Sequence, residues 1–268
     1  MEYMANVDYK KLFDMTGKVC IVTGGTGYLG SGNVKALKDF GATVVVADVR
    51  PQEDRWGDAP VSAGDMFVEC DLRSLDSVKN CFKTVYEKYG RIDVLVSCAC
   101  YGVRGGATSF MEELEDEKFS EGVEGIIGST FRCLREVVPY MKKTGGSIIN
   151  YCSMYGLVAP DLRMYGDSYQ RQGPSYGAGK AAVAQFTRYA AVDLAHYGIR
   201  VNSVTPGPFP NPHKQDDPEF NQKLADHTML GRFGYNHEMA GAVLLLASDA
   251  GSFMTGTNIT VDGGWTAW

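Results

Sequence analysis

The stretch KVCIVTGGTGYLG, Lys18 to Gly30, decides the fold class of this 268-residue chain. Its first half is an apolar run typical of a buried strand, and its second half is a glycine-rich turn that opens a helix. Gly24, Gly27 and Gly30 let the backbone turn tightly and approach a pyrophosphate, which the free amides at the helix start would stabilise. The stretch therefore predicts the dinucleotide-binding end of a strand–helix–strand unit.

An acidic residue follows at the position that distinguishes the nicotinamide cofactors. Asp48 lies 18 residues after Gly30, at the end of the second expected strand. Its carboxylate can accept hydrogen bonds from the ribose hydroxyls of NAD and would repel the 2′-phosphate of NADP. We therefore predict NAD as the cofactor. Arg50 keeps NADP open as an alternative, because an arginine can bind that phosphate.

Apolar runs alternate with amphipathic segments along the rest of the chain. Strands separated by helical crossovers form a parallel sheet that is covered on both faces. The predicted fold class is α/β, a single-domain doubly wound parallel sheet (Rossmann-like) of about seven strands with helices on both faces. Residues 1–16 are expected to be an N-terminal extension, and 17–268 the domain. Further strands are expected at 42–49, 66–71, 92–98, 146–152, 199–204 and 258–262, and helices at 75–89, 174–197 and 238–248, with another ending near 141.

Charge and composition argue against several classes of function. The formal net charge is −6 and no block of five basic residues occurs, so we expect no nucleic-acid partner and no membrane partner. No apolar run reaches the roughly 18 residues of a membrane span, and the amino-terminal segment lacks the apolar core of a signal peptide, which predicts a cytoplasmic protein. The seven cysteines are scattered and the four histidines show no ligand spacing, so we expect reduced thiols and no metal.

A tyrosine and a lysine four residues apart form the candidate catalytic pair. In the segment SYGAGKAA, Tyr176 and Lys180 occupy one face of a helix that follows Pro174, so both could point at one bound molecule. A phenol is a poor base at neutral pH because it ionises only at about pH 10. The Lys180 ammonium and the helix start would both favour the phenolate. The spacing alone also fits an ordinary helix turn, so other motifs must decide.

From Gly17 onward the sequence resembles the short-chain dehydrogenase/reductase family over essentially the whole chain. The segments SMYGLVAPDLRMYG and YGAGK further resemble bacterial members that act on sugars, nucleotide-linked sugars or sugar acids. The resemblance is collective, because the motifs occur in the family's order: the glycine turn, Asp71, Ser153, the Tyr176-x-x-x-Lys180 pair, VNSVTPG at 201–207 and the ending VDGGW.

The resemblance implies an oxidoreductase that interconverts a secondary alcohol and a ketone by hydride transfer. The predicted catalytic residues are Tyr176 as general base or acid, Ser153 as hydrogen-bond donor to the substrate oxygen, and Lys180, which would also hold the nicotinamide ribose. Asp71 would meet the adenine, and Pro206-Gly207 would lie beside the nicotinamide. The predicted cofactor-binding residues are Gly24, Thr26, Gly27, Tyr28, Leu29, Gly30, Asp48, Asp71, Leu72, Ser97, Tyr176, Lys180, Pro206 and Gly207.

The sequence departs from the family pattern at several places. Tyr28 stands where a glycine is usual, and SCAC at 97–100 replaces an Asn-Asn-Ala-Gly segment. The range 101–149 holds no asparagine, although the family places one there to anchor a water chain to the catalytic lysine. Either backbone carbonyls and water replace it, or proton transfer is slower or follows another route. Ser153 and Tyr176 are 23 residues apart, which is wider than usual.

Two long segments, near 154–173 and 206–235, are expected to cover the site. The favoured hypothesis is an NAD-dependent dehydrogenase of a sugar, sugar acid or other polyhydroxylated small molecule. A non-redox epimerase-like or dehydratase-like enzyme and an NAD-binding regulatory protein without turnover are the alternatives. The family also implies a homo-oligomer, a tetramer or a dimer. Candidate groups for substrate hydroxyls or a carboxylate are Arg163, Tyr165, Arg171, His213, Lys214 and Arg232.

Overall fold

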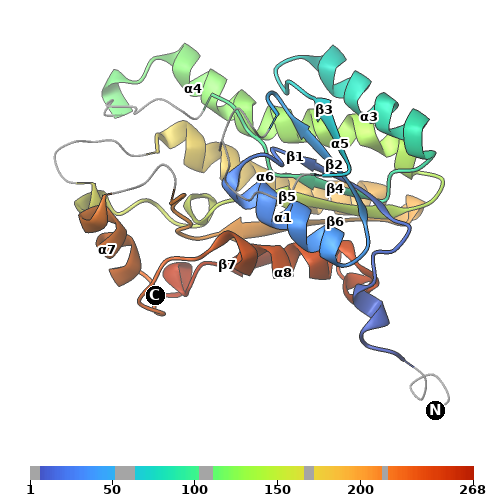
Figure 1. The fold of residues 1–268 in the computed structure, drawn as a ribbon. Helices are drawn as coiled ribbons and strands as arrows, with labels where there is room; N and C mark the ends of the chain where they lie inside the picture. Colours follow the sequence, from blue (N-terminus) through green and yellow to red (C-terminus); the bar gives the residue numbers. More distant parts are fainter. Residues whose placement is uncertain (1–6, 52–63, 103–110, 166–171, 213–216) are drawn as a thin grey trace.

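Short apolar strands form one parallel sheet at the centre of the molecule (Figure 1). The computed structural model describes residues 7–51, 64–102, 111–165, 172–212 and 217–268, and within them the sheet has seven strands in the order β3-β2-β1-β4-β5-β6-β7. The doubly wound α/β prediction is confirmed. The strands are β1 (Val19–Thr23), β2 (Thr43–Asp48), β3 (Met66–Glu69), β4 (Val94–Ser97), β5 (Gly146–Tyr151), β6 (Ile199–Pro206) and β7 (Asn258–Val261).

The alternation of side chains along each strand divides the interior into two cores. Val19 and Ile21 of β1 pack into one buried cluster, whereas Cys20 and Val22 between them pack into the other. Successive side chains of a strand point to opposite faces, so a strand that is buried along its whole length, such as β1, requires cover on both sides.

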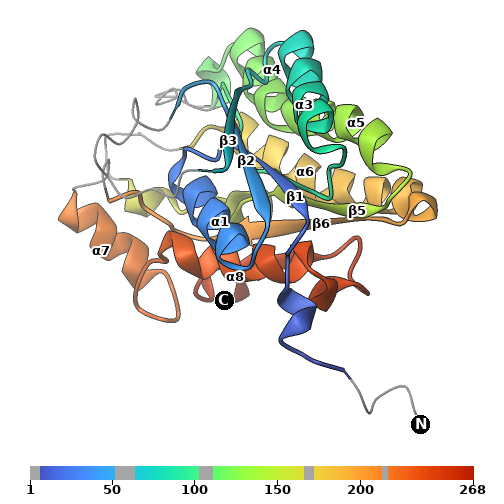
Figure 2. The same ribbon diagram turned by 45° about the vertical axis from the view of Figure 1, so that its right-hand side comes forward.

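Helices supply that cover on both faces of the sheet (Figure 2). One layer contains α1 (Tyr28–Asp39) and α8 (Asn236–Ala247), and the opposite layer contains α3 (Leu75–Tyr89), α5 (Ser129–Met141) and α6 (Pro174–Leu194). Two shorter helices, α4 (Asp116–Val123) and α7 (Pro218–Asp226), flank the layers. No helix among the described residues is long and apolar enough to cross a membrane.

Some helix boundaries differ from the expected ones. α6 ends at Leu194, and the last expected residues form a separate 3-10 turn, Ala195–Tyr197. α8 begins at Asn236 rather than Glu238, because the Glu238 carboxylate accepts a hydrogen bond from the Tyr235 amide at 2.9 Å and thereby caps the first turn.

Candidate active site

Two large cavities formed by described residues lie at the carboxyl ends of the parallel strands. One is lined by the turns after β1, β3 and β4 and by the end of β2, and the other by the chain after β5 and the start of α6. This edge is where open α/β sheets bind their ligands. The first cavity has a volume of about 470 Å³ and the second of about 450 Å³.

Most of the predicted cofactor residues line the first cavity. Its wall also contains groups that the sequence did not single out, among them Arg73, Phe209 and Asn211. These follow strands β3 and β6 by a few residues, so the only signal for them was their position after a strand. The predicted residues in the lining are Gly24, Gly27, Tyr28, Leu29, Gly30, Asp48, Asp71 and Leu72.

The glycine turn makes a cradle that a larger residue would fill. Gly27 is the N-cap of α1, and Gly30 lies in the first helical turn beneath it. A Cβ atom added to Gly30 would lie 2.1 Å from the Gly24 carbonyl oxygen, so the turn depends on the absence of a side chain there. The amides at the start of α1 and the close-packed turn fit the pyrophosphate of a dinucleotide.

Asp48 is held firmly at the end of β2. Its two carboxylate oxygens accept hydrogen bonds from the Thr26 hydroxyl at 2.5 Å and from the Val49 amide at 2.8 Å. Thr26 is buried and does not line the cavity. Its hydroxyl therefore holds the Asp48 carboxylate in position and does not contact the cavity itself. Arg73 reaches the same cavity, but its guanidinium pairs with Asp71 at 2.7 Å.

Five other predicted cofactor residues lie outside the lining of the first cavity: Tyr176 and Lys180 of α6, and Ser97, Pro206 and Gly207 at or just after the ends of β4 and β6. Ser97 is buried at the end of β4, and its hydroxyl meets no hydrogen-bond partner among the described residues. Pro206 ends β6, and the Gly207 amide donates to the Val261 carbonyl at 2.9 Å, which ties the turn to β7. Phe209 and Asn211, a few residues later, form the wall instead.

Tyr176 and Lys180 share one face of α6, as the spacing predicts. Tyr176 lines the second cavity in the first helical turn, whereas Lys180 is buried one turn later. The Lys180 Nζ lies 5.8 Å from the centre of the Tyr176 ring and donates to the Tyr151 carbonyl at 2.8 Å. Burial opposes the charge of Lys180, but the neighbouring Cys100 and Tyr176 groups outweigh it and raise the pKa of the ammonium.

The third predicted catalytic residue lies in a turn that packs against the same helix. Ser153 precedes the 3-10 turn Met154–Gly156, and its hydroxyl accepts a hydrogen bond from the Tyr155 amide at 3.2 Å. A Cβ atom on Gly156 would lie 2.8 Å from the Lys180 carbonyl carbon, so the two backbones touch at this point. The contact brings the Ser153 turn to α6 despite the long intervening segment.

A widened turn interrupts the helix in which the expected asparagine is missing. Residues Glu124–Gly128 form a π-turn between α4 and α5, a feature that often marks functional sites. The Gly125 carbonyl accepts from the Tyr101 amide at 3.1 Å and from the Ser129 hydroxyl at 2.8 Å. The Ser129 hydroxyl and a backbone amide therefore supply hydrogen bonds to a carbonyl of the π-turn. The helical pattern of the sequence did not indicate that this turn is widened.

The candidate substrate-binding groups are only partly in place. Arg163 is 89% exposed and pairs with Asp161 at 2.6 Å, and Arg232 pairs with Glu238 at 2.7 Å. The Tyr165 hydroxyl bonds to the Tyr155 hydroxyl at 2.6 Å. Arg171, His213 and Lys214 lie outside the described residues. Within the described ranges, no group of three or more histidine, cysteine, aspartate or glutamate side chains could hold a metal ion.

Comparison with known proteins agrees with this geometry. A family profile described as Enoyl-(Acyl carrier protein) reductase matches residues 28–266. The 2,5-dichloro-2,5-cyclohexadiene-1,4-diol dehydrogenase of Sphingobium indicum is 33% identical over 263 residues, with 95% of this chain and 99% of the relative covered. The trans-4-hydroxycyclohexanecarboxylate dehydrogenase of Sinomonas cyclohexanicum is 33% identical over 259 residues, with 93% of each covered.

The fold comparison leads to the same family. The crystal structure of a short-chain type dehydrogenase/reductase from Mycobacterium marinum superposes with a TM-score of 0.81 at 28% identity, covering 98% of this chain and 100% of that one. The profile match spans most of the chain, and the two curated relatives align over nearly their whole length. This chain therefore belongs to the short-chain dehydrogenase/reductase family and is an oxidoreductase that uses a nicotinamide dinucleotide.

Proposed function

We propose that this protein is an NAD-dependent dehydrogenase that interconverts a secondary alcohol and a ketone on a hydroxylated ring, such as a cyclic polyol or a sugar. The observation that carries the proposal is the placement of Tyr176 on a cavity wall, 5.8 Å from the buried ammonium of Lys180. The names of the two curated relatives support a six-membered ring as the body of the substrate.

The side chains on the cavity wall can move the proton that the reaction requires. In the direction of oxidation, the Tyr176 phenolate accepts the hydroxyl proton of the alcohol, and the Lys180 charge favours that phenolate. Ser153 uses a lone pair to accept from the Tyr155 amide, so its own proton can be donated to the substrate oxygen. A bound nicotinamide supplies the acceptor for the hydride that leaves the carbon.

Backbone groups support the lysine where the asparagine is missing. The Lys180 ammonium donates to the Tyr151 carbonyl, and the π-turn carbonyls are bonded to Tyr101 and Ser129. In this proposal the Tyr151 carbonyl holds the Lys180 ammonium, and water next to the ammonium relays the proton without an asparagine side chain.

Turnover with a panel of compounds tests the proposed function. We expect nicotinamide absorbance to report NAD reduction with at least one cyclic alcohol, cyclic polyol or sugar. If calorimetry shows that NAD binds and no member of the panel is oxidised or reduced, the non-redox and regulatory hypotheses replace the dehydrogenase.

We expect Asp48 to set the preference for NAD. Replacing Asp48 with asparagine removes the charge that would repel a 2′-phosphate and weakens the acceptor for the ribose hydroxyls, so the NAD-to-NADP ratio of kcat/KM is expected to fall about tenfold. Asp65→Asn is the matched control, because Asp65 accepts from the Val44 amide at 2.8 Å and does not line the cofactor cavity. Wild-type preference for NADP would contradict the assignment.

We also expect the protein to form a homo-oligomer through α5 and α6. Phe131 of α5 contacts Phe186 of α6 edge-on at 6.0 Å, and Tyr189 and Val192 continue this apolar stripe with 67% and 77% exposure. Light scattering is expected to show an oligomer for the wild type and a smaller species for Val192→Glu. The control is the same change at Phe253, which is fully exposed outside the stripe. A monomeric wild type would contradict this expectation.

A further inference from the structure

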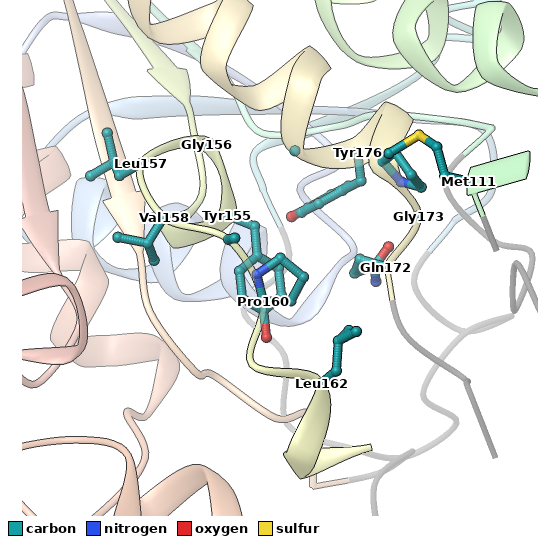
Figure 3. Close-up of a pocket in the computed structure, with 13 residues that line it drawn as sticks. Met111, Tyr155, Gly156, Leu157, Val158, Pro160, Leu162, Gln172, Gly173 and Tyr176 are labelled. Atoms are coloured by element: carbon teal, nitrogen blue, oxygen red, sulfur yellow. The ribbon is translucent and has the colours of Figure 1, made fainter. Parts of the chain in front are cut away.

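The cavity beside Tyr176 is lined mainly by apolar side chains (Figure 3). Leu157, Val158, Pro160 and Leu162 come from the chain after β5, and Met111 comes from the segment before α4. A wall of this kind favours a ligand surface without polar groups, because substrate hydroxyls that face it would lose their bonds to water without replacement.

The described lining residues of this cavity include no aspartate, glutamate, lysine or arginine. Arg163 is next to Leu162 in the chain, but its guanidinium is directed to Asp161: Nε donates two hydrogen bonds to the carboxylate and Nη2 donates one. Its exposure of 89% places it in solvent rather than in the cavity. A substrate carboxylate would therefore be desolvated against this wall without a described cation to pair with it.

Two polar side chains in the lining, besides Tyr176, can bind a neutral group. The Tyr155 hydroxyl is already bonded to Tyr165 at 2.6 Å, and burial raises the pKa of Tyr155, so this phenol stays neutral. Gln172 lies on the side of the cavity that leads into α6, and its amide offers both a donor and an acceptor (Figure 3). An amide of this kind can donate to a carbonyl oxygen, and it can both donate to and accept from a hydroxyl.

We propose that this cavity selects a neutral six-membered ring alcohol with an apolar edge, and that Gln172 binds a second hydroxyl on that ring. The proposal rests on the dehydrogenase function proposed above. It narrows the substrate of the enzyme to carbocyclic diols and to rings that lack hydroxyl groups along one edge. The reacting hydroxyl faces Tyr176 and Ser153, the apolar edge faces Leu157 and Leu162, and the second hydroxyl meets the amide of Gln172.

A pair of compounds of similar shape tests the class of substrate. Trans-4-methylcyclohexanol and trans-4-hydroxycyclohexanecarboxylate share the ring and the reacting hydroxyl, and differ in a methyl group against a carboxylate. We expect kcat/KM to favour the methyl compound by about tenfold or more, because the carboxylate meets no cation among the described lining residues. A preference for the carboxylate overturns the inference but leaves the dehydrogenase function standing.

A binding measurement separates this inference from the function on which it rests. Calorimetry on the NADH-loaded protein with the same two compounds needs no turnover, and tighter binding of the methyl compound is expected. If neither compound nor any sugar is turned over, the dehydrogenase function fails, while the order of the two affinities still supports or overturns the neutral, apolar character of the cavity.

Substitutions at two lining residues locate the selectivity. Leu162→Arg is expected to shift the ratio of the two kcat/KM values toward the carboxylate by about tenfold, whereas Phe253→Arg, outside the cavity, leaves it unchanged.

Gln172→Leu is expected to lower kcat/KM for cyclohexane-1,4-diol about fivefold relative to cyclohexanol. Gln222→Leu, outside the lining, is the control for that change. An unchanged diol-to-monool ratio in Gln172→Leu overturns the assignment of that residue.

Discussion

Replacing Tyr176 with phenylalanine is expected to lower kcat by about a thousandfold, because the change removes the group that exchanges a proton with the substrate oxygen. The ring remains, so the apolar contacts of Tyr176 with the buried cluster around Tyr155 and Met164 persist. NAD binding is expected to be retained, since the described lining of the cofactor cavity does not include Tyr176. Steady-state kinetics and calorimetry measure the two effects separately.

Tyr155→Phe is the matched control for this prediction. Tyr155 lines the same cavity, but its hydroxyl bonds to Tyr165 and burial raises the pKa of the phenol, so it is unsuited to accept a proton at neutral pH. We expect a loss of about tenfold at most, from the altered wall of the cavity. Equal losses in the two variants would show that Tyr176 shapes the cavity and does not transfer the proton.

Replacing Gly156 with alanine is expected to lower kcat by about a hundredfold, because small displacements of catalytic groups are costly. The added Cβ atom would lie 2.8 Å from the Lys180 carbonyl carbon and 2.9 Å from the Ala181 nitrogen, both of which belong to a rigid helix. The turn that carries Ser153 must then move away from α6. The overpacking is also expected to reduce the free energy of unfolding by about 1–3 kcal/mol.

Gly241→Ala provides the same chemical change without the contact. Gly241 lies in α8, where an added Cβ atom would meet nothing within 4 Å. Alanine is favoured over glycine within a helix, so this variant is expected to be as stable as the wild type or slightly more stable, with unchanged kcat. Normal turnover in Gly156→Ala would show that the turn and α6 can separate without disturbing the chemistry.

The sequence predicts the sheet because its signals are local. A run such as 19–22 is apolar at every position, which requires a strand buried on both faces, and the alternation between the two cores follows directly from the strand period. The cradle at Gly30 is predictable for the same reason, since the atom it approaches belongs to Gly24, six residues earlier.

Features that depend on contacts between distant segments could not be predicted. The approach of Gly156 to Lys180 and the path that brings Phe209 into the cofactor cavity arise from tertiary packing. The π-turn at 124–128 was also not predicted, because it widens a single turn between helices that continue on both sides. The sequence shows that most residues at 157–162 are apolar. It does not show that the Arg163 side chain points away from the cavity that they line.

The two cavities draw on different stretches of the chain. Most of the described wall on the cofactor side precedes residue 102, whereas most of the substrate side comes from 155–162 and 172–177. The residues of the substrate side can therefore change during evolution while those of the cofactor side stay the same. A duplicated gene can then gain activity on a different alcohol substrate without having to evolve a new nucleotide site. Grafting the segment between β5 and α6 from a relative would be the corresponding step for an engineer, and the backbone contact at Gly156 marks where such a graft has to match.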